Sequence, residues 1–205
     1  IAIALVLGTP FFIYFGSLSA RLGRKKIMLT GMLLAALAYY PIYKAMDNVG
    51  NLQMKQEQTE LYKIESNSAR NESGELVISS TRVHSYTDGS ILRETGDKKE
   101  LTVSRTNIAW LVFLIFIQVL FVTMVYAPIA AFLVELFPTR IRYTSMSLPY
   151  HIGNGIFGGL LPTISTILVA QTGNHLAGLI YPIAISVICF VVGIIYLKDK
   201  RGVAL

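Results

Sequence analysis

Long apolar stretches and shorter polar ones alternate along this chain of 205 residues, of which 53% are hydrophobic and 15% are charged. A helix needs about 20 mostly apolar residues to cross the hydrocarbon core of a bilayer. The pattern therefore predicts an all-α membrane protein with five transmembrane helices. The expected spans are Ile1–Leu18, Ile27–Met46, Asn107–Val134, Ser145–Ala170 and Ala177–Leu197.

One polar stretch, residues 47–105, is too long for a tight turn and too polar to enter a membrane. Its segments Glu75–Tyr86 and Ser90–Val103 are rich in β-branched residues. The Asp88-Gly89 pair between them is typical of a hairpin turn. The pattern predicts a small β-hairpin or meander, interpreted as a solvated cap, with an external recognition module as the alternative.

The chain is therefore expected to have three parts. Residues 1–46 form two transmembrane helices joined by a basic loop, residues 47–105 form the insertion, and residues 106–205 form three transmembrane helices and a short tail. Within the insertion, Leu52–Glu65 is expected to form either a polar helix or an extended chain. Three tyrosines near the end of the second span, Tyr39, Tyr40 and Tyr43, are typical of an aromatic belt at the membrane surface.

The formal net charge of +6 is unevenly distributed. Nine of the ten Lys and Arg residues outside the insertion lie in the clusters Arg21–Lys26, Arg140–Arg142 and Lys198–Arg201. Clusters in short loops stay on the cytoplasmic side of a membrane, and alternation of the five spans places all three clusters there. The insertion is then extracytoplasmic and the C-terminus cytoplasmic. Such clusters do not form the continuous basic surface that binds nucleic acid.

Catalytic and metal chemistry are poorly supported by the sequence. Cys189 is the only cysteine, so no internal disulfide is expected. The histidines His84, His151 and His175 are far apart and lack the close spacing of metal ligands. No Ser-His-acid set or phosphate-binding loop is recognisable. The sequence predicts a protein that is not an enzyme and has no cofactor.

Polar residues inside the spans are the candidates for a substrate or proton pathway. Such residues are costly against lipid and are expected to face a bundle interior or an aqueous cavity. Tyr150, His151 and Asn154 are expected to share one helix face by their i, i+1 and i+4 spacing. His151 is a candidate proton carrier, or a histidine hydrogen-bonded to a neighbouring helix. The full set is Gln118, Tyr126, Tyr150, His151 and Asn154.

Two further features concern helix packing and charge pairing. Gly155 and Gly159 form a GxxxG pair, which predicts close helix packing or a deformable helix. Glu135 is the only acidic residue associated with the spans, apart from Asp199 in the tail. Its candidate partners are Arg140 and Arg142 nearby and Arg21 and Arg24 in the other cytoplasmic loop. The cluster is either a topology anchor or a conformational gate.

Three segments resemble the C-terminal half of a major facilitator superfamily transporter. The run GSLSARLGRK at residues 16–25 resembles the loop motif G-x-L-x-D-R-x-G-R-K, and ELFPTRIR at residues 135–142 is similar to the E-x-F-P-T-x-x-R segment after the tenth helix. Residues 143–162 most resemble the metabolite:proton symporter branch, which includes proline/betaine, shikimate, citrate and α-ketoglutarate carriers. The resemblance does not extend to the insertion.

The resemblance implies that the spans are helices eight to twelve of a twelve-helix fold, with the N-terminal half and helix seven preceding this chain. Ala20 stands where the motif has Asp, which leaves Glu135 as the expected counter-charge. The residues that the resemblance assigns to a cytoplasmic gate are Gly16, Arg21, Gly23, Arg24, Lys25, Glu135, Arg140 and Arg142.

The expected function is secondary active transport at the plasma (inner) membrane. A small polar metabolite, either a carboxylate or a zwitterion, would cross with H⁺ by alternating access. The expected partners are the lipid bilayer, the metabolite with its proton, and the N-terminal half of the same transporter, with no nucleic acid. The alternative is a membrane-anchored sensor or receptor that binds its ligand through residues 47–105.

Overall fold

The computed structural model describes residues 1–52, 55–58, 61–70, 76–96 and 98–197. The predicted basic cluster Lys198–Arg201 lies outside these residues. The chain divides into two compact units, which we call the helical unit (Ile1–Lys44 with Val112–Leu205) and the insertion unit (Ala45–Leu111).

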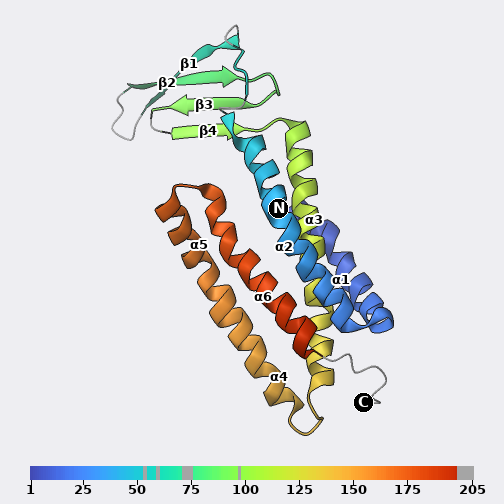
Figure 1. The fold of residues 1–205 in the computed structure, drawn as a ribbon. Helices are drawn as coiled ribbons and strands as arrows, with labels where there is room; N and C mark the ends of the chain where they lie inside the picture. Colours follow the sequence, from blue (N-terminus) through green and yellow to red (C-terminus); the bar gives the residue numbers. More distant parts are fainter. Residues whose placement is uncertain (53–54, 59–60, 71–75, 97, 198–205) are drawn as a thin grey trace. The chain divides into compact units, whose positions relative to one another are not determined.

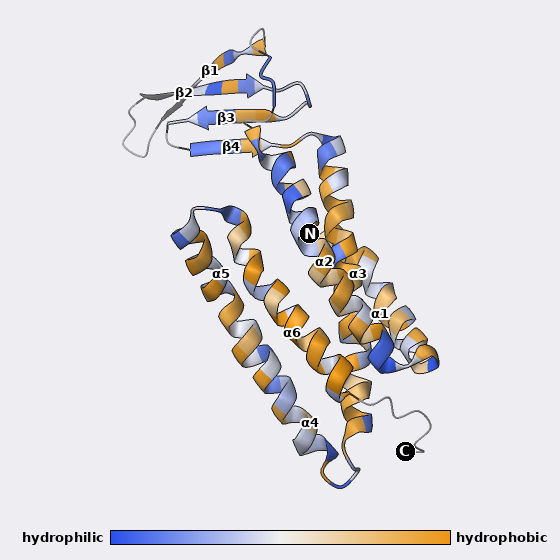
Figure 2. Ribbon diagram, in the orientation of Figure 1, coloured by the Kyte–Doolittle hydropathy of each residue, from blue (hydrophilic) through white to orange (hydrophobic). Residues whose placement is uncertain are grey.

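Five helices among the described residues are long and apolar enough to cross a membrane, which confirms the predicted fold class (Figure 1). Their backbone groups are bonded within each helix, as an apolar solvent requires. Apolar residues run along these helices (Figure 2). The first three are α1 (Ala2–Leu22), α2 (Arg24–Gly50) and α3 (Arg105–Leu136). The fourth is continuous through α4 (Arg142–His151), η3 (Ile152–Gly158) and α5 (Gly159–Thr172). The fifth consists of η4 (His175–Leu179) followed by α6 (Ile180–Tyr196).

Small residues set the closest approaches between helices of the helical unit. A Cβ added at Gly31 in α2 would lie 2.9 Å from the Cβ of Met124 in α3. One added at Gly193 in α6 would lie 2.5 Å from Leu29 Cδ2 in α2. Ser186 in α6 also donates a hydrogen bond of 3.0 Å to the carbonyl oxygen of Met32. Glycines thus bring α2 against both α3 and α6.

The described residues make no helix contact at the predicted GxxxG pair, Gly155 and Gly159. In the part of the chain that the structure describes, a Cβ added at Gly155 or Gly159 would meet nothing within 4 Å. Gly155 lies in the π-helix Ile152–Gly158, between α4 and α5, and Gly159 is the first residue of α5.

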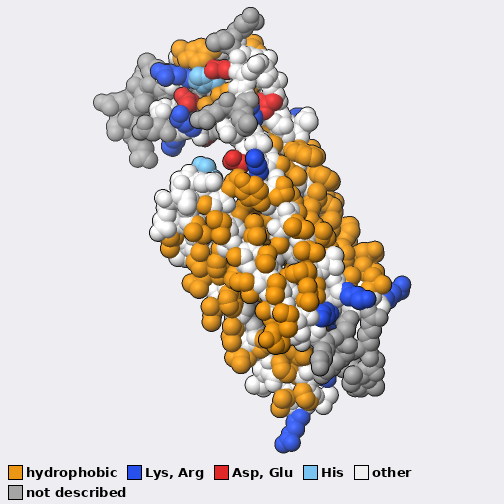
Figure 3. Space-filling model, viewed as in Figure 1, with side chains coloured by type: hydrophobic (Ala, Val, Ile, Leu, Met, Phe, Trp, Pro, Cys, Tyr) orange, Lys and Arg blue, Asp and Glu red, His pale blue; other side chains and the backbone are white. Residues whose placement is uncertain are grey.

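The surface of the helical unit is largely apolar, as a lipid-facing surface requires. Val6, Ile13 and Ile195 have relative exposures of 72%, 80% and 66%. Hydrophobic side chains cover most of the face that the helical unit shows in Figure 3, and several Lys and Arg side chains lie near the lower end of that unit.

The insertion unit contains a four-stranded antiparallel meander in the order β1-β2-β3-β4, which confirms the predicted β insertion. Asp88 and Gly89 lie in the turn between β2 and β3, as predicted. The second predicted β segment is divided by Gly96, whose positive φ of 57° permits the tight turn between β3 and β4. The strands are β1 (Lys63–Arg70), β2 (Leu76–Ser85), β3 (Ile91–Thr95) and β4 (Lys98–Thr102).

Asp88 connects the β2–β3 turn to other segments of the insertion unit through hydrogen bonds and an ion pair. Its Oδ2 accepts hydrogen bonds from Asn107 Nδ2 at 2.7 Å and Ser90 Oγ at 2.8 Å, and lies 2.7 Å from Lys55 Nζ. Burial is the largest influence and raises the pKa of Asp88, but the contacts with Lys55 and Ser90 together outweigh it and lower the pKa from 3.8 to about 2. The carboxylate therefore stays ionised at neutral pH and links the turn to the first turn of α3.

Candidate functional site

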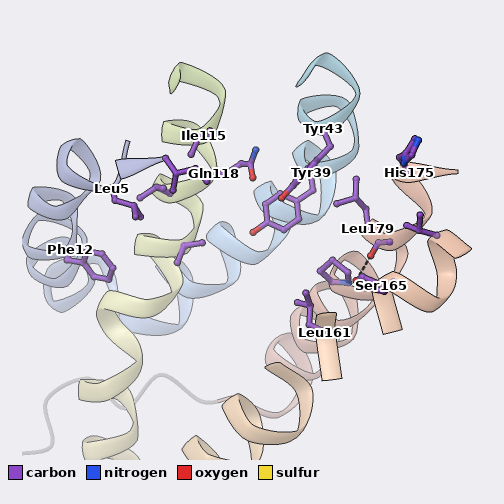
Figure 4. Close-up of a pocket in the computed structure, with 17 residues that line it drawn as sticks. Leu5, Phe12, Tyr39, Tyr43, Ile115, Gln118, Leu161, Ser165, His175 and Leu179 are labelled. Carbon is purple, nitrogen blue, oxygen red and sulfur yellow. Dashed lines mark hydrogen bonds between the residues drawn. The ribbon is translucent and has the colours of Figure 1, made fainter. Parts of the chain in front are cut away.

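The helical unit contains a cavity of about 750 Å³ to which each of its five long helices contributes (Figure 4). This volume lies within the range of small-molecule sites, about 300–1,000 Å³. Most of the wall is aliphatic. The described lining residues are Ile1, Leu5, Phe12, Tyr39, Tyr43, Ile115, Gln118, Val119, Val122, Leu161, Ser165, Thr166, Val169, His175, Gly178, Leu179 and Pro182.

Tyr39 and Tyr43 supply the aromatic part of the wall. They lie one helical turn apart on α2, with ring centroids 6.4 Å apart and ring planes at 85° to each other. Figure 4 shows both rings and Gln118 of α3 reaching into the space between these helices and the α5–α6 pair. Sequence reasoning placed the two tyrosines in a membrane-surface belt, because hydropathy does not show which side of a helix faces a neighbour.

Two hydroxyl groups of α5 belong to the same wall. Ser165 Oγ donates a hydrogen bond of 2.9 Å to the carbonyl oxygen of Gly178, and Thr166 Oγ1 donates one of 2.7 Å to that of Pro162. Each hydroxyl has one proton, so both oxygens remain available mainly as acceptors. Among the described residues that line the cavity, none is Asp, Glu, Lys or Arg.

The other polar pathway candidates form a second group outside this cavity. Tyr126 Oη donates a hydrogen bond of 3.3 Å to Asn154 Oδ1, and Tyr150 lies close enough to interact with the Tyr126 hydroxyl. His151 Nδ1 instead donates to the carbonyl oxygen of Ser147 at 2.8 Å, one turn back on its own helix. The structure therefore brings Tyr126, Tyr150 and Asn154 together and places Gln118 in the cavity. The His151 ring lies against that of Tyr150, with centroids 6.1 Å apart, but its Nδ1 is bonded to its own helix.

The helical unit carries an ion pair between α2 and α3. Arg24 Nη2 lies 2.6 Å from Glu135 Oε1, and the two side chains are 21% and 32% exposed. Arg24 is the first residue of α2, and Glu135 lies in the last turn of α3. The only residue between α1 and α2 is Gly23, whose φ of 105° suits glycine. This tight turn helps to direct Arg24 towards α3.

Lys25 makes a second link from the same turn. Its Nζ donates hydrogen bonds to the carbonyl oxygens of Ile194, at 3.0 Å, and Leu197, at 2.6 Å. These carbonyls belong to the end of α6, where the last four have no partner within the helix and the helix dipole favours a positive charge. Arg24 and Lys25 therefore connect the start of α2 to the ends of two other helices.

The remaining gate candidates have other surroundings. Arg142 Nε donates to the carbonyl oxygen of Phe137 at 3.3 Å and closes the turn between α3 and α4. Arg21 and Arg140 are exposed, and a Cβ added at Gly16 would meet no described atom within 4 Å. The part of the chain that the structure describes also holds no group of three His, Cys, Asp or Glu side chains suited to a metal ion.

No family model matches the chain, and no solved structure matches it significantly. A Staphylococcus aureus (strain COL) protein named for proline/betaine transport is 41% identical over 78 residues, which are 38% of this chain and 17% of that protein. The Citrate-proton symporter of Klebsiella pneumoniae is 36% identical over 73 residues, 36% of this chain and 16% of the symporter.

A Haemophilus influenzae protein named for metabolite transport is 31% identical over 98 residues, 47% of this chain and 20% of that protein. Each match covers a fifth or less of the relative's length. The chain is therefore a protein with five membrane-length helices that is similar, over part of its length, to proteins named as transporters.

Proposed function

We propose that this chain forms part of a secondary active transporter that moves a small polar metabolite across the plasma membrane by alternating access. The observation that carries the proposal is the separation of the cavity from the ion pair along α2 and α3. An alternating-access carrier needs a central site that opens to one side while the other side is closed.

The separation follows from positions along the helices. Tyr39 lies 15 residues after Arg24 on α2, or about 22 Å at 1.5 Å per residue. Gln118 lies 17 residues before Glu135 on α3, or about 25 Å by the same rise. Lining residues of α1, α5 and α6 also come from the halves of those helices that lie away from the ion pair.

The direction of opening follows from charge. Basic clusters in short loops stay in the cytoplasm, so the Arg24–Glu135 pair and the Lys25 contacts lie on the cytoplasmic side. These contacts hold that end closed, and the cavity lies towards the extracytoplasmic side. Breaking them would shift the population towards the opposite state. The π-helix Ile152–Gly158 is a weak point in the α4–α5 helix, where bending costs less than in a regular helix.

Proton coupling is part of the proposal. His175 lines the cavity, whereas His151 is hydrogen-bonded to its own helix. Imidazole is the side chain that most readily exchanges a proton near neutral pH. His175 is therefore the better-placed group for passing a proton between the extracytoplasmic solution and the cavity.

Uptake measurements test the proposed function. Cells that express the complete natural protein should accumulate at least one labelled solute from a panel of carboxylates and zwitterions, and a protonophore should abolish the accumulation. Cells without the protein are the control. Absence of accumulation for every solute, with the protein present in the membrane fraction, would contradict the proposal.

A further inference from the structure

We infer that the π-helix Ile152–Gly158 is one of two states of this segment, that the Tyr181 hydroxyl of α6 stabilises it, and that conversion of the segment to α-helix turns α4 relative to α5. The inference rests on the proposed function only for its role in transport. It is carried by a hydrogen bond of 3.1 Å from Tyr181 Oη to the carbonyl oxygen of Phe157, inside the π-helix.

The sequence weakens a regular helix at this segment. Three of its seven residues are glycine, which disfavours a helix more than any residue except proline. Pro162 has no backbone N–H, so it offers no donor to the carbonyls of Gly158 and Phe157, four and five residues before it. The Gly159 N–H donates to the carbonyl of Ile156, only three residues back. The backbone hydrogen bonds therefore lose their α-helical spacing at the end of the segment.

Two tyrosine hydroxyls from neighbouring helices bond to the π-helix. Tyr181 lies in the first turn of α6, which runs beside α5 (Figure 1). Tyr126 of α3 donates a hydrogen bond of 3.3 Å to Asn154 Oδ1. In a membrane, polar groups freed by an irregular helix are satisfied by side chains of neighbouring helices, because no water competes for them. Both hydroxyls bond to the segment in its π-helical form and so favour that form.

Conversion to α-helix changes the orientation of one flank. A turn closed by bonds between residues five apart holds about one residue more than an α-helical turn, and one residue corresponds to about 100° of rotation. The α5 flank is anchored, because Ser165 Oγ bonds to the Gly178 carbonyl at 2.9 Å and a Cβ added at Gly178 would lie 3.2 Å from Ser165 Cβ. No residue of α4 is buried in the described structure. The rotation therefore moves α4 and carries Tyr150 away from the Tyr126 hydroxyl, while Ser165 stays in the cavity wall.

Distances between spin labels in the complete protein test the inference. One label is placed on α4 at Tyr143→Cys and one on α6 at Val191→Cys, with all native cysteines replaced; both positions are exposed. Tyr181→Phe removes only the hydroxyl and should raise the ratio of a second distance population to the first about fivefold, the size of effect expected from one hydrogen bond. Tyr196→Phe is the matched control on the same helix, because Tyr196 is 75% exposed, and should leave the ratio unchanged.

Deletion of one residue separates a change of helix register from other movements. Without Gly153, the segment can run as a regular α-helix while both flanks keep the orientation seen here. The Phe157 carbonyl can then accept from the Leu161 N–H, four residues later, and no longer depends on Tyr181. The deletion variant should show one distance population, with or without Tyr181→Phe. It should reach the membrane in normal amount and take up solute at least tenfold more slowly, because the register can no longer change.

The outcomes separate this inference from the proposed function. An unchanged ratio in Tyr181→Phe, an equal change in Tyr196→Phe, or a second population that persists after deletion of Gly153 would overturn the inference. A deletion variant that does not fold, or that takes up solute at the wild-type rate, would also overturn it. Absence of uptake by the wild type would contradict the proposed function, and the distance measurements would still decide the inference.

Discussion

Reversing the charge of Arg24 or of Glu135 alone is expected to lower uptake at least tenfold, and reversing both is expected to restore most of it. Arg24→Glu and Glu135→Arg each place like charges where the structure has a contact of 2.6 Å. The double variant restores an ion pair with its direction exchanged. Initial rates of uptake, corrected for the amount of protein in the membrane, measure the effect.

The size of this effect follows from partial exposure of the pair. At an effective dielectric constant of 20, two unit charges 4 Å apart interact by roughly 4 kcal/mol, whereas fully exposed pairs contribute about 0–1 kcal/mol. Side chains exposed by 21% and 32% lie between these limits. A change of about 1.4 kcal/mol shifts a conformational equilibrium tenfold.

Arg21→Glu is the matched control for the charge reversals. Arg21 lies in the same basic loop and is exposed, so this variant changes the charge by the same amount away from the pair. It should retain most of the uptake. If the double reversal is no better than the single ones, the pairing of Arg24 with Glu135 does not control the transport cycle.

Replacing Gly31 is expected to give the largest loss of stability. A Cβ at this position would lie 2.9 Å from Met124 Cβ, 3.0 Å from Val125 Cγ2 and 3.3 Å from the Phe121 carbonyl oxygen. Overpacking of this kind typically costs about 1–3 kcal/mol, and a longer side chain would separate α2 from α3. Gly31→Ala should lower the melting temperature in detergent, and Gly31→Leu should leave little folded protein.

Gly155→Ala provides the control, because the described structure has nothing within 4 Å of its added Cβ. Both variants put Ala for Gly inside a helix and so change backbone entropy similarly. The melting temperature of Gly155→Ala should be unchanged or slightly higher. Equal losses for the two variants would contradict the α2–α3 packing seen here.

The spans were predictable because crossing a membrane demands a length and composition that few other structures share. The ion pair was only partly predictable. Four cations are candidates for Glu135 from the sequence, and the choice of Arg24 depends on the turn at Gly23 and on how α2 lies beside α3. Charge and loop length limit the candidates, but helix packing selects among them.

The cavity could not be predicted from the sequence, for a physical reason. Helices α1, α3 and α6 are apolar on all sides, so hydropathy does not show which side faces a neighbour. Tyr39 and Ser165 acquire a common role only when α2 and α5 are placed together. The π-helix could not be predicted either, because no feature of the run IGNGIFG distinguishes a π-helix from an α-helix.

Labelling of single cysteines from the two sides of the membrane tests the central claim most directly, namely that the ion-paired end is cytoplasmic and the opposite end extracytoplasmic. In the complete protein with Cys189→Ser and every other native cysteine replaced, Asn174→Cys and Thr87→Cys should react with an impermeant maleimide on intact cells. Ala20→Cys and Thr139→Cys should react only after the membrane is permeabilised. Labelling of Ala20→Cys or Thr139→Cys on intact cells to the same extent as Asn174→Cys would contradict the account.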